Sequence, residues 1–240
     1  MLPLYILTGF LGSGKTTVLN QLLSVRAAEG TPGKIGLIVN ELGDIGVDGA
    51  LLPPGASRQI ELPGGCVCCV LSDDLANTIV ELLEQSPELE AIVLETTGAA
   101  EPLPLVWALE NPPLAERVRL GAIITVVDAE GFVATRHLTP AVEAQVLHAD
   151  LLLLSKEDLA DPRAIEATLA AVHELAPRVE LRRGGPAAHA RWLHSVLLDP
   201  SAELRARGDE CHDQHCHDHA HHHHERPEPS TEHVLESAGA

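Results

Sequence analysis

The residues best suited to chemistry form a glycine-rich segment near the start of the chain. Residues 9–16 read Gly-Phe-Leu-Gly-Ser-Gly-Lys-Thr and follow a short apolar run at residues 4–7. In such a segment backbone N–H groups surround a phosphate, Lys15 reaches the β- and γ-phosphates, and the Thr16 hydroxyl ligates Mg²⁺. The alternative is a chance glycine-rich turn, which the complete motif disfavours. The predicted nucleotide contacts of this phosphate loop are Gly9, Gly12, Ser13, Gly14, Lys15, Thr16 and Thr17.

Two carboxylates stand at the ends of later apolar runs. Glu95 follows the run at residues 91–94, and Gly98 comes three residues after it. At the carboxyl edge of a parallel sheet, such a carboxylate can hold Mg²⁺ through water, and such a glycine can sense the γ-phosphate. Asp128, after the run at residues 122–127, competes for the same magnesium role. A simple helix cap is the alternative for both carboxylates.

A base-reading motif is predicted at residues 155–158, which read Ser-Lys-Glu-Asp after the apolar run at residues 151–154. These residues occupy the place of an Asn-Lys-x-Asp motif, with Lys156 and Asp158 at the matching positions. Asp158 would accept hydrogen bonds from guanine N1–H and the 2-amino group, which adenine cannot supply, so it favours GTP over ATP. Ser155 weakens the prediction because a hydroxyl cannot make the contacts of an amide, and a plain surface turn is the alternative.

Three of the chain's five cysteines are packed together in one glycine-flanked segment. Cys66, Cys68 and Cys69 offer thiolates that can converge on one soft or borderline cation. An odd number of cysteines argues against a disulfide framework, although a vicinal disulfide or inert thiols are the alternatives. The cluster therefore predicts a metal site.

A second group of metal ligands lies in the low-complexity stretch at residues 211–229, which cannot bury itself. An expression tag or a neutral spacer is the alternative, but the stretch is internal and mixed in composition. It should bind divalent metal with little fixed geometry. The candidate ligands are His212, His215, Cys216, His217, His219, His221, His222, His223 and His224.

Composition limits the partners of these sites. The chain has 240 residues, of which 45% are hydrophobic and 2% aromatic, and its formal net charge is −19. That charge repels nucleic acids and anionic membranes, and few aromatic residues are available to stack on bases. The chain has neither an apolar run long enough to span a bilayer nor a secretory signal pattern. We therefore expect a cytoplasmic protein whose partners are small molecules, metal ions or another protein.

The strands and helices that must position these residues alternate along the chain. Buried strands are predicted at residues 4–7, 35–39, 91–94, 122–127 and 151–154, and a further strand is predicted at residues 59–62. Helices are predicted after Lys15, from a Ser72 cap, and from Asp161 with Pro162 in its first turn. The pattern predicts an α/β fold of the P-loop NTPase type, with a doubly wound, mostly parallel sheet and flanking helices. We expect this domain at residues 1–183, a helical linker at 184–210, and a disordered His-rich tail at 211–240.

Several motifs together resemble the CobW-type metallochaperone GTPases, a group that includes the hydrogenase, urease and methylmalonyl-CoA mutase maturation GTPases. The resemblance rests on residues 9–17, 40–43, 65–69, 95–98 and 126–129, in that order. It implies a GTPase whose Cys-x-Cys-Cys thiolates bind Zn²⁺ or Co²⁺ and whose nucleotide state controls delivery of that metal. It further implies that Glu41 lies in a switch loop and couples the nucleotide to the metal. Family members usually carry a further strand-rich domain after the His-rich linker, and only residues 230–240 follow it here.

The combined expectation is a GTP-binding and GTP-hydrolysing metallochaperone that delivers Zn²⁺ or Co²⁺ to a client metalloprotein or a cofactor-biosynthesis complex. Its cofactors would be GTP or GDP, Mg²⁺ and the transition metal, and a homodimer is an open expectation. The residues expected to carry hydrolysis are Lys15, Thr16, Glu41 and Glu95. A metal buffer with incidental nucleotide binding and a P-loop small-molecule kinase are the alternatives. Because no water-orienting Gln or arginine finger is identifiable, basal turnover should be slow.

Overall fold

The computed structural model describes residues 1–30, 33–39, 57–61 and 71–198. In these ranges the strands form one sheet of seven, in the order β3-β2-β4-β1-β5-β6-β7, and all neighbours are parallel. The strands are β1 (Leu2–Thr8), β2 (Lys34–Val39), β3 (Ser57–Glu61), β4 (Leu89–Glu95), β5 (Val118–Asp128), β6 (Leu151–Ser155) and β7 (Glu180–Arg183). The helices are α1 (Lys15–Glu29), α2 (Leu71–Gln85), α3 (Pro102–Leu109), α4 (Phe132–Thr135), α5 (Pro140–Leu147), α6 (Pro162–Leu175) and α7 (Pro186–Leu198).

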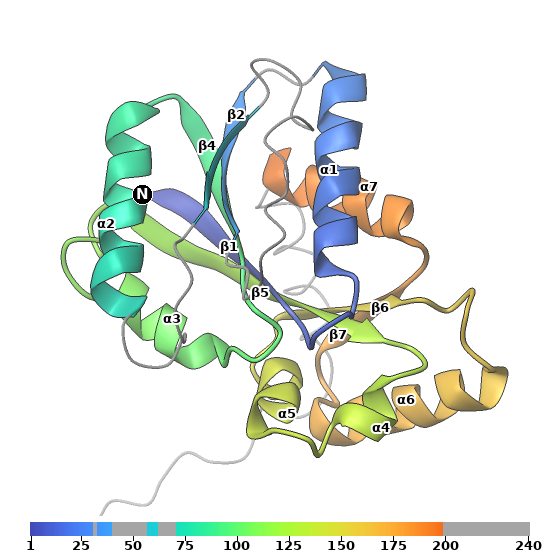
Figure 1. Cartoon of the computed structure of the whole chain (residues 1–240). Helices are drawn as coiled ribbons and strands as arrows, with labels where there is room; N and C mark the ends of the chain where they lie inside the picture. The colour runs from blue at the N-terminus through green and yellow to red at the C-terminus, as the bar shows by residue number, and fades with distance from the viewer. Residues whose placement is uncertain (31–32, 40–56, 62–70, 199–240) are drawn as a thin grey trace, which may run out of the picture. The chain divides into compact units, whose positions relative to one another are not determined.

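Helices cover both faces of the sheet, which confirms the doubly wound α/β prediction (Figure 1). On one face, α1 and α7 pack against side chains such as Leu7 and Leu153. On the other face, α2 and α3 cover β4 and β1, whereas α4, α5 and α6 cover β5 and β6. The central strands are buried on both sides, which is why they appear in the sequence as continuous apolar runs.

Local sequence explains some helix boundaries better than others. Asp161 caps α6 as predicted, because its Oδ1 accepts a hydrogen bond from the Arg163 N–H at 2.8 Å and Pro162 begins the helix. The predicted Ser72 cap is wrong, since α2 already begins at Leu71. Ser72 therefore lies inside the helix, a shift typical of helix ends inferred from one polar residue.

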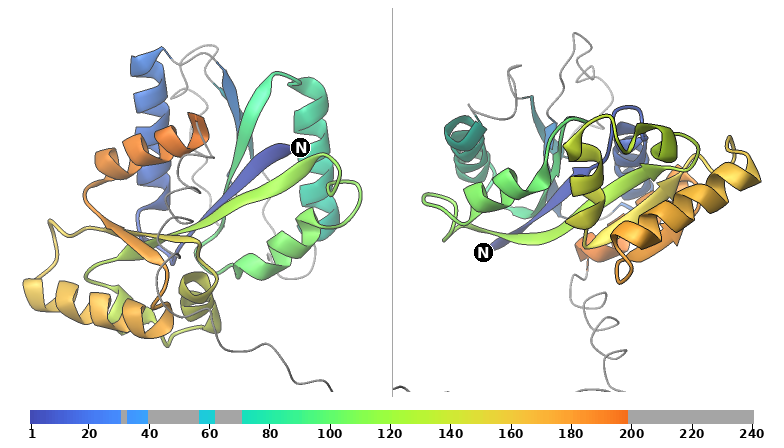
Figure 2. Two further views of the ribbon diagram at one scale, coloured as in Figure 1. Left: turned by 180° about the vertical axis from the view of Figure 1, so that it is seen from behind. Right: turned by 90° about the horizontal axis from the view of Figure 1, so that it is seen from below.

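The last described helix belongs to the core and is not a linker. The chain divides into a unit of Met1–Glu203 and a unit of Leu204–Ala240, and the second unit lies outside the described residues. Within the first unit, part of the expected helical linker forms α7, which packs against α1 (Figure 2). Its buried Leu193 and Leu197 join the cluster that contains Leu22. The compact unit therefore extends beyond the boundary expected at residue 183, because α7 has an apolar face that needs burial.

No helix in the described ranges is long and apolar enough to cross a membrane.

The contact between α7 and α1 predicts a pH dependence of stability. His194 is 3% exposed, and its Nδ1 lies 3.2 Å from Glu29 Oε2. Burial lowers the pKa of His194 from 6.5, Glu29 opposes this shift, and Arg26 reinforces it. Because the unfolded chain then binds more protons than the folded one, the free energy of unfolding should fall as pH decreases from about 6.5 toward the lowered pKa.

A His194→Gln variant should therefore show a shallower pH dependence of the free energy of unfolding. Urea unfolding followed by tryptophan fluorescence between pH 7.5 and 5 measures this dependence. The matched control is His173→Gln on the exposed surface of α6. Equal slopes for His194→Gln and the unmodified chain would contradict the prediction.

Candidate functional site

The glycine-rich segment connects β1 to α1 at the carboxyl edge of the sheet. Gly9 has a φ of 139°, and a Cβ atom at this position would lie 2.3 Å from the Val126 carbonyl oxygen. Only glycine fits so close to the neighbouring strand. The Ser13 N–H then donates to the Phe10 carbonyl at 3.1 Å and closes the turn. The backbone therefore turns tightly at residues 9–13, as a phosphate-binding loop requires.

The N-terminus of α1 faces this loop. The helix begins at Lys15, and its N-cap residue, Gly14, has a φ of 102° and makes no side-chain capping hydrogen bond. The first turn of a helix has N–H groups without intrahelical partners, and the helix dipole adds partial positive charge there. A loop of backbone donors that leads into such a turn suits a phosphate group. Thr17, the predicted α-phosphate contact, is exposed in this first turn.

Lys15 lies inside the loop and is only 8% exposed. Its Nζ donates to the carbonyl oxygens of Gly9 at 2.9 Å and Phe10 at 3.3 Å. Burial lowers the pKa of Lys15, and the charge of Glu95 opposes that shift. A buried ammonium is costly unless it meets an anion, so the loop favours a ligand with several negative charges.

Thr16 and Glu95 meet beside the lysine. The Thr16 hydroxyl donates to Glu95 Oε1 at 2.6 Å, and Glu95 is 3% exposed. The parallel register brings them together, because Leu7 in β1 pairs with Glu95 at the end of β4. A hydroxyl and a carboxylate are oxygen ligands of the kind that Mg²⁺ prefers. These residues therefore fit the magnesium role predicted for them.

Asp128, the competing carboxylate, has different partners. One carboxylate oxygen accepts from Lys156 Nζ at 2.7 Å, and the other accepts from the Glu130 N–H at 3.0 Å. The geometry thus places Glu95 beside Thr16 and pairs Asp128 with the lysine of the base-reading segment. These different partners favour Glu95 over Asp128 as the predicted magnesium ligand.

Gly98 packs directly on the phosphate loop. A Cβ atom at Gly98 would lie 2.3 Å from the backbone nitrogen of Leu11, so a larger residue would push the segment after β4 away from the loop. Gly98 is therefore placed to respond to changes in that loop, as the γ-phosphate prediction requires. The γ-phosphate contact itself stays a prediction.

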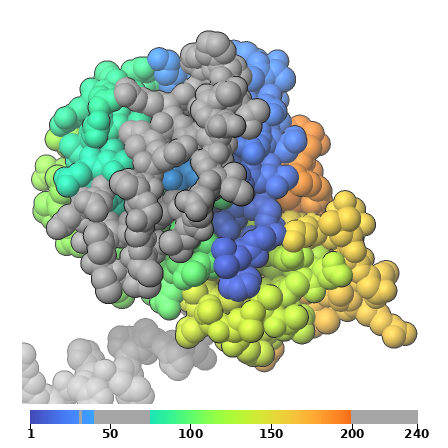
Figure 3. Space-filling model, in the orientation of Figure 1, coloured from blue at the N-terminus to red at the C-terminus, as the bar shows by residue number. Residues whose placement is uncertain are grey.

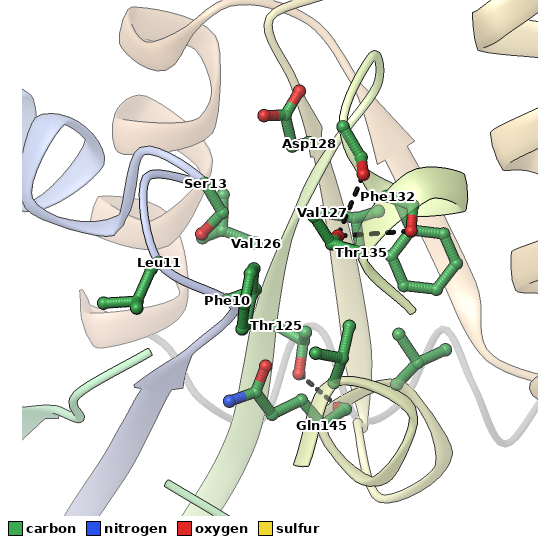
Figure 4. Close-up of a pocket in the computed structure, with 13 residues that line it drawn as sticks. Phe10, Leu11, Ser13, Thr125, Val126, Val127, Asp128, Phe132, Thr135 and Gln145 are labelled. Carbon is green, nitrogen blue, oxygen red and sulfur yellow. Dashed lines mark hydrogen bonds between the residues drawn. The ribbon is translucent and has the colours of Figure 1, made fainter. Parts of the chain in front are cut away.

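Sequence analysis missed one buried residue of this region, Gln145. Its Nε2 donates to the carbonyl oxygens of Gly98 at 3.1 Å and Ala100 at 2.9 Å, and its backbone carbonyl accepts from the Thr125 hydroxyl. Figure 4 shows Gln145 and Thr125 beside Phe10, around a small cavity of about 40 Å³. In the sequence, Gln145 is a polar residue on the otherwise apolar face of α5. A helical pattern by itself does not mark such a residue as part of a site.

The base-reading segment follows β6 at the same edge of the sheet. The Ser155 hydroxyl donates to the Ser13 carbonyl at 2.6 Å, and the Val127 carbonyl lies 3.1 Å away as a second acceptor. Ser155 therefore ties this segment to the phosphate loop, despite being shorter than the asparagine expected there. Asp158 is exposed and lines an open cavity of about 750 Å³ with residues of the β7–α7 connection.

On the surface, the phosphate loop lies beside the helices that follow β5. In Figure 3 the blue surface of the phosphate loop and α1 adjoins the yellow-green surface of α4 and α5. The structure brings together Lys15, Thr16, Glu95 and Gly98, and it joins them to Lys156 through Asp128 and Ser155 of neighbouring strands.

The remaining predicted residues lie outside the described ranges. They are Glu41, Cys66, Cys68, Cys69, His212, His215, Cys216, His217, His219, His221, His222, His223 and His224. Within the part of the chain that the structure describes, no group of three or more His, Cys, Asp or Glu side chains could hold a metal ion. The metal predictions for the thiolates and the tail therefore stay predictions.

A parallel sheet with a glycine-rich loop and a lysine at its carboxyl edge defines a P-loop nucleotide-binding protein. The family model described as "CobW/HypB/UreG, nucleotide-binding domain" matches residues 3–182. The chain belongs to this family, as its motifs predicted.

Curated relatives and solved structures agree with this membership. The chain is 36% identical over 194 residues to "Zinc chaperone CobW" from Sinorhizobium sp, covering 69% of this chain and 54% of that protein. It is 32% identical over 185 residues to "Zinc chaperone YjiA" from Escherichia coli, covering 75% and 57%. The Zn(II)-bound YjiA GTPase from E. coli aligns with a TM-score of 0.58 and 26% identity, covering 75% of this chain and 57% of that chain.

A more distant structure, HypB from Helicobacter pylori in complex with nickel, aligns with a TM-score of 0.56 at 14% identity and covers 85% of this chain and 88% of that chain. At that identity it supports the fold alone. The chain spans about half of the first curated relative, with 54% covered, and 64% of a second, "Zinc chaperone CobW" from Pseudomonas aeruginosa.

Proposed function

We propose that this chain binds and hydrolyses GTP and that the nucleotide state controls its handling of Zn²⁺. The observation that carries the nucleotide half is the contact between Thr16 and Glu95 beside the buried Lys15. Relatives named zinc chaperones and a relative solved as a Zn(II)-bound GTPase support the metal half. Zn²⁺ is the cargo here, and Co²⁺ remains a second candidate for the same thiolate chemistry.

Each residue of the site has a defined task in this proposal. Lys15 and the backbone donors of the phosphate loop bind and orient the β- and γ-phosphates. Thr16 and Glu95 hold Mg²⁺, which neutralises charge on the phosphate oxygens when it is bound. Asp158 reads guanine, and Lys156, whose ammonium donates to Asp128, would lie beside the base. Catalysis then consists mainly of positioning and electrostatic stabilisation.

The metal-handling half involves residues outside the described ranges. Cys66, Cys68 and Cys69 would bind Zn²⁺ tightly, and the His-rich tail would bind it loosely. Glu41 would transmit the nucleotide state to the thiolates, and the loaded protein would pass the metal to a client metalloprotein or a cofactor-biosynthesis complex. The support is the order of these motifs in a chain of this family.

Zn²⁺ affinity in different nucleotide states tests the proposal. The full chain is titrated with Zn²⁺ against a chromophoric chelator in the presence of GDP, a non-hydrolysable GTP analogue or a non-hydrolysable ATP analogue. The tight Zn²⁺ affinity should differ by about tenfold or more between GDP and the GTP analogue, within the usual range of allosteric coupling. The ATP analogue should not reproduce the effect of the GTP analogue.

Cysteine variants locate the tight site. Cys66→Ser should remove tight binding but spare loose binding by the tail, whereas the control Cys211→Ser should leave tight binding intact. Equal Zn²⁺ affinity in all nucleotide states would instead identify a metal buffer. An ATP analogue that acts as well as the GTP analogue would remove the guanine selectivity and favour the kinase alternative.

A further inference from the structure

The half-buried carboxylate of Glu157, next to Asp158, is hydrogen-bonded to the segment that leads from β7 to α7. The Glu157 side chain is 18% exposed, and its Oε2 accepts from Arg183 Nε at 2.8 Å and also from Arg183 Nη2. Its Oε1 accepts from the backbone N–H of Gly184 at 2.9 Å. Both oxygens of Glu157 are thus committed to the end of β7 and the first residue after it.

These contacts join two segments that are far apart in the sequence. Glu157 and Asp158 follow β6, whereas Arg183 and Gly184 lead from β7 toward α7. The strands β6 and β7 are parallel neighbours, and Leu154 pairs with Arg183 at their carboxyl ends. The Glu157 carboxylate therefore joins the two segments at the edge of the sheet where the predicted base-reading segment lies.

The same segments line the open cavity that Asp158 faces. Its lining residues are Glu157, Asp158, Arg183, Gly184, Gly185 and Pro186, and its volume is about 750 Å³. Small-molecule sites commonly measure about 300–1,000 Å³, so this cavity is large enough for a nucleobase and its ribose. Asp158 lines it from the segment after β6, and the β7–α7 connection, here called the β7–α7 wall, lines it from the other segment.

The three hydrogen bonds to Glu157 are geometrically specific. Two N–H groups of Arg183 converge on Oε2 of Glu157, and hydrogen bonds between charged groups are stronger than neutral ones. The additional bond to the Gly184 N–H fixes the backbone of the wall as well as a side chain. Replacing Glu157 would therefore remove the hydrogen bonds that it accepts from Arg183 and from the Gly184 N–H.

We infer that Glu157 is a positioning residue for nucleobase selection, because it holds the β7–α7 wall at the distance from Asp158 that a guanine base requires. This inference rests on the proposed binding of GTP. Selection by hydrogen bonds depends on a base that is held within a few tenths of an ångström, since misplaced groups leave Asp158 without full contacts. A loosened wall should therefore weaken guanine binding more than adenine binding.

Nucleotide affinities of the full chain test this role. Fluorescently labelled GDP and ADP are titrated into the unmodified chain, Glu157→Ala, Glu157→Gln and Arg183→Ala. Glu157→Ala should raise the Kd for GDP about fivefold to twentyfold and change the Kd for ADP less than about twofold, as expected from loss of polar positioning contacts. The kcat at saturating GTP should change little, because Glu157 does not touch the phosphates, while KM rises.

A double variant and a control separate positioning from general damage. Glu157→Ala combined with Arg183→Ala should be no worse than Glu157→Ala alone, since that single variant already removes every contact between Glu157 and Arg183. Glu180→Gln, in the exposed ion pair with Arg182 on the same strand, should behave like the unmodified chain. Arg183→Lys keeps the positive charge but not the paired donors, and it should retain the fold with a partial loss of guanine preference.

The possible failures are distinguishable. If the unmodified chain shows no preference for GDP over ADP, the proposed function fails and this inference fails with it. If the unmodified chain prefers GDP and Glu157→Ala keeps that preference in full, only the inference is overturned. Equal losses of GDP and ADP affinity in Glu157→Ala would also overturn it, because they indicate a purely structural role.

Discussion

Replacing Lys15 with alanine should reduce kcat for GTP hydrolysis about 10²- to 10³-fold, the usual effect of removing one donor that stabilises charge in a transition state. The reason is its position, since the Lys15 ammonium lies inside the phosphate loop and is 8% exposed. In this low-dielectric setting its charge acts strongly on phosphate oxygens, and Lys15 is the only lysine or arginine among residues 9–16. Single-turnover phosphate release measures the loss.

A stability measurement shows whether the Lys15 variant still folds. Burial lowers the pKa of Lys15, which means that the folded chain without a ligand disfavours its charged form. Removing the ammonium should therefore leave the free energy of unfolding equal or slightly higher in the absence of nucleotide. The control, Lys34→Ala, removes an exposed lysine paired with Glu88 and should keep normal hydrolysis. Near-normal kcat in a folded Lys15→Ala variant would contradict the assigned role.

A Glu95→Gln substitution should raise the Mg²⁺ concentration for half-maximal hydrolysis about 10- to 100-fold, as is usual when an outer-shell carboxylate of a metal site is lost. Glutamine has the same shape and still offers an oxygen to the Thr16 hydroxyl, which lies 2.6 Å from Glu95 Oε1. The substitution therefore removes charge while it preserves the local hydrogen bond. Hydrolysis rates measured across a Mg²⁺ titration report the change.

Two further variants test whether the effect belongs to this site. Thr16→Ala should also raise the Mg²⁺ concentration for half-maximal hydrolysis. The double variant should show a less than additive increase, because both residues serve one ion. Glu166→Gln on the exposed surface of α6 removes a carboxylate at a distance and should have no effect. A normal Mg²⁺ titration for Glu95→Gln would return the magnesium role to Asp128.

Glu95 and Asp128 illustrate what the sequence could not separate. Each ends an apolar run, and each was therefore a candidate for the same ion. The choice depends on register: Leu7 pairs with Glu95, whereas Asp128 pairs with Ser155 and so lies beside Lys156. Which residues of two parallel strands lie opposite each other depends on both strands and on the connection between them, so the end of a single strand does not show its neighbours.

Other residues were misread or overlooked for the same reason. Gln145 lies in a helical pattern without special spacing, yet its side-chain amide donates to the carbonyls of Gly98 and Ala100. Glu157 was only the variable position of a motif, and its partner Arg183 lies in a different strand. The apolar face of α7 was visible in the sequence, but its burial against α1 was not.

The sequence by itself determined the phosphate loop, the central strands, the cap of α6 and membership of the family. These features depend on neighbouring residues: glycines permit a tight loop, apolar runs mark strands buried on both faces, and Asp161 reaches an N–H two residues away. The tertiary structure decided which strand-end carboxylate meets Thr16, how far the core extends, and which side chains link the loops at the carboxyl edge of the sheet. Those outcomes depend on contacts between distant segments, and such contacts form only once the sheet brings the carboxyl ends of its strands to one edge.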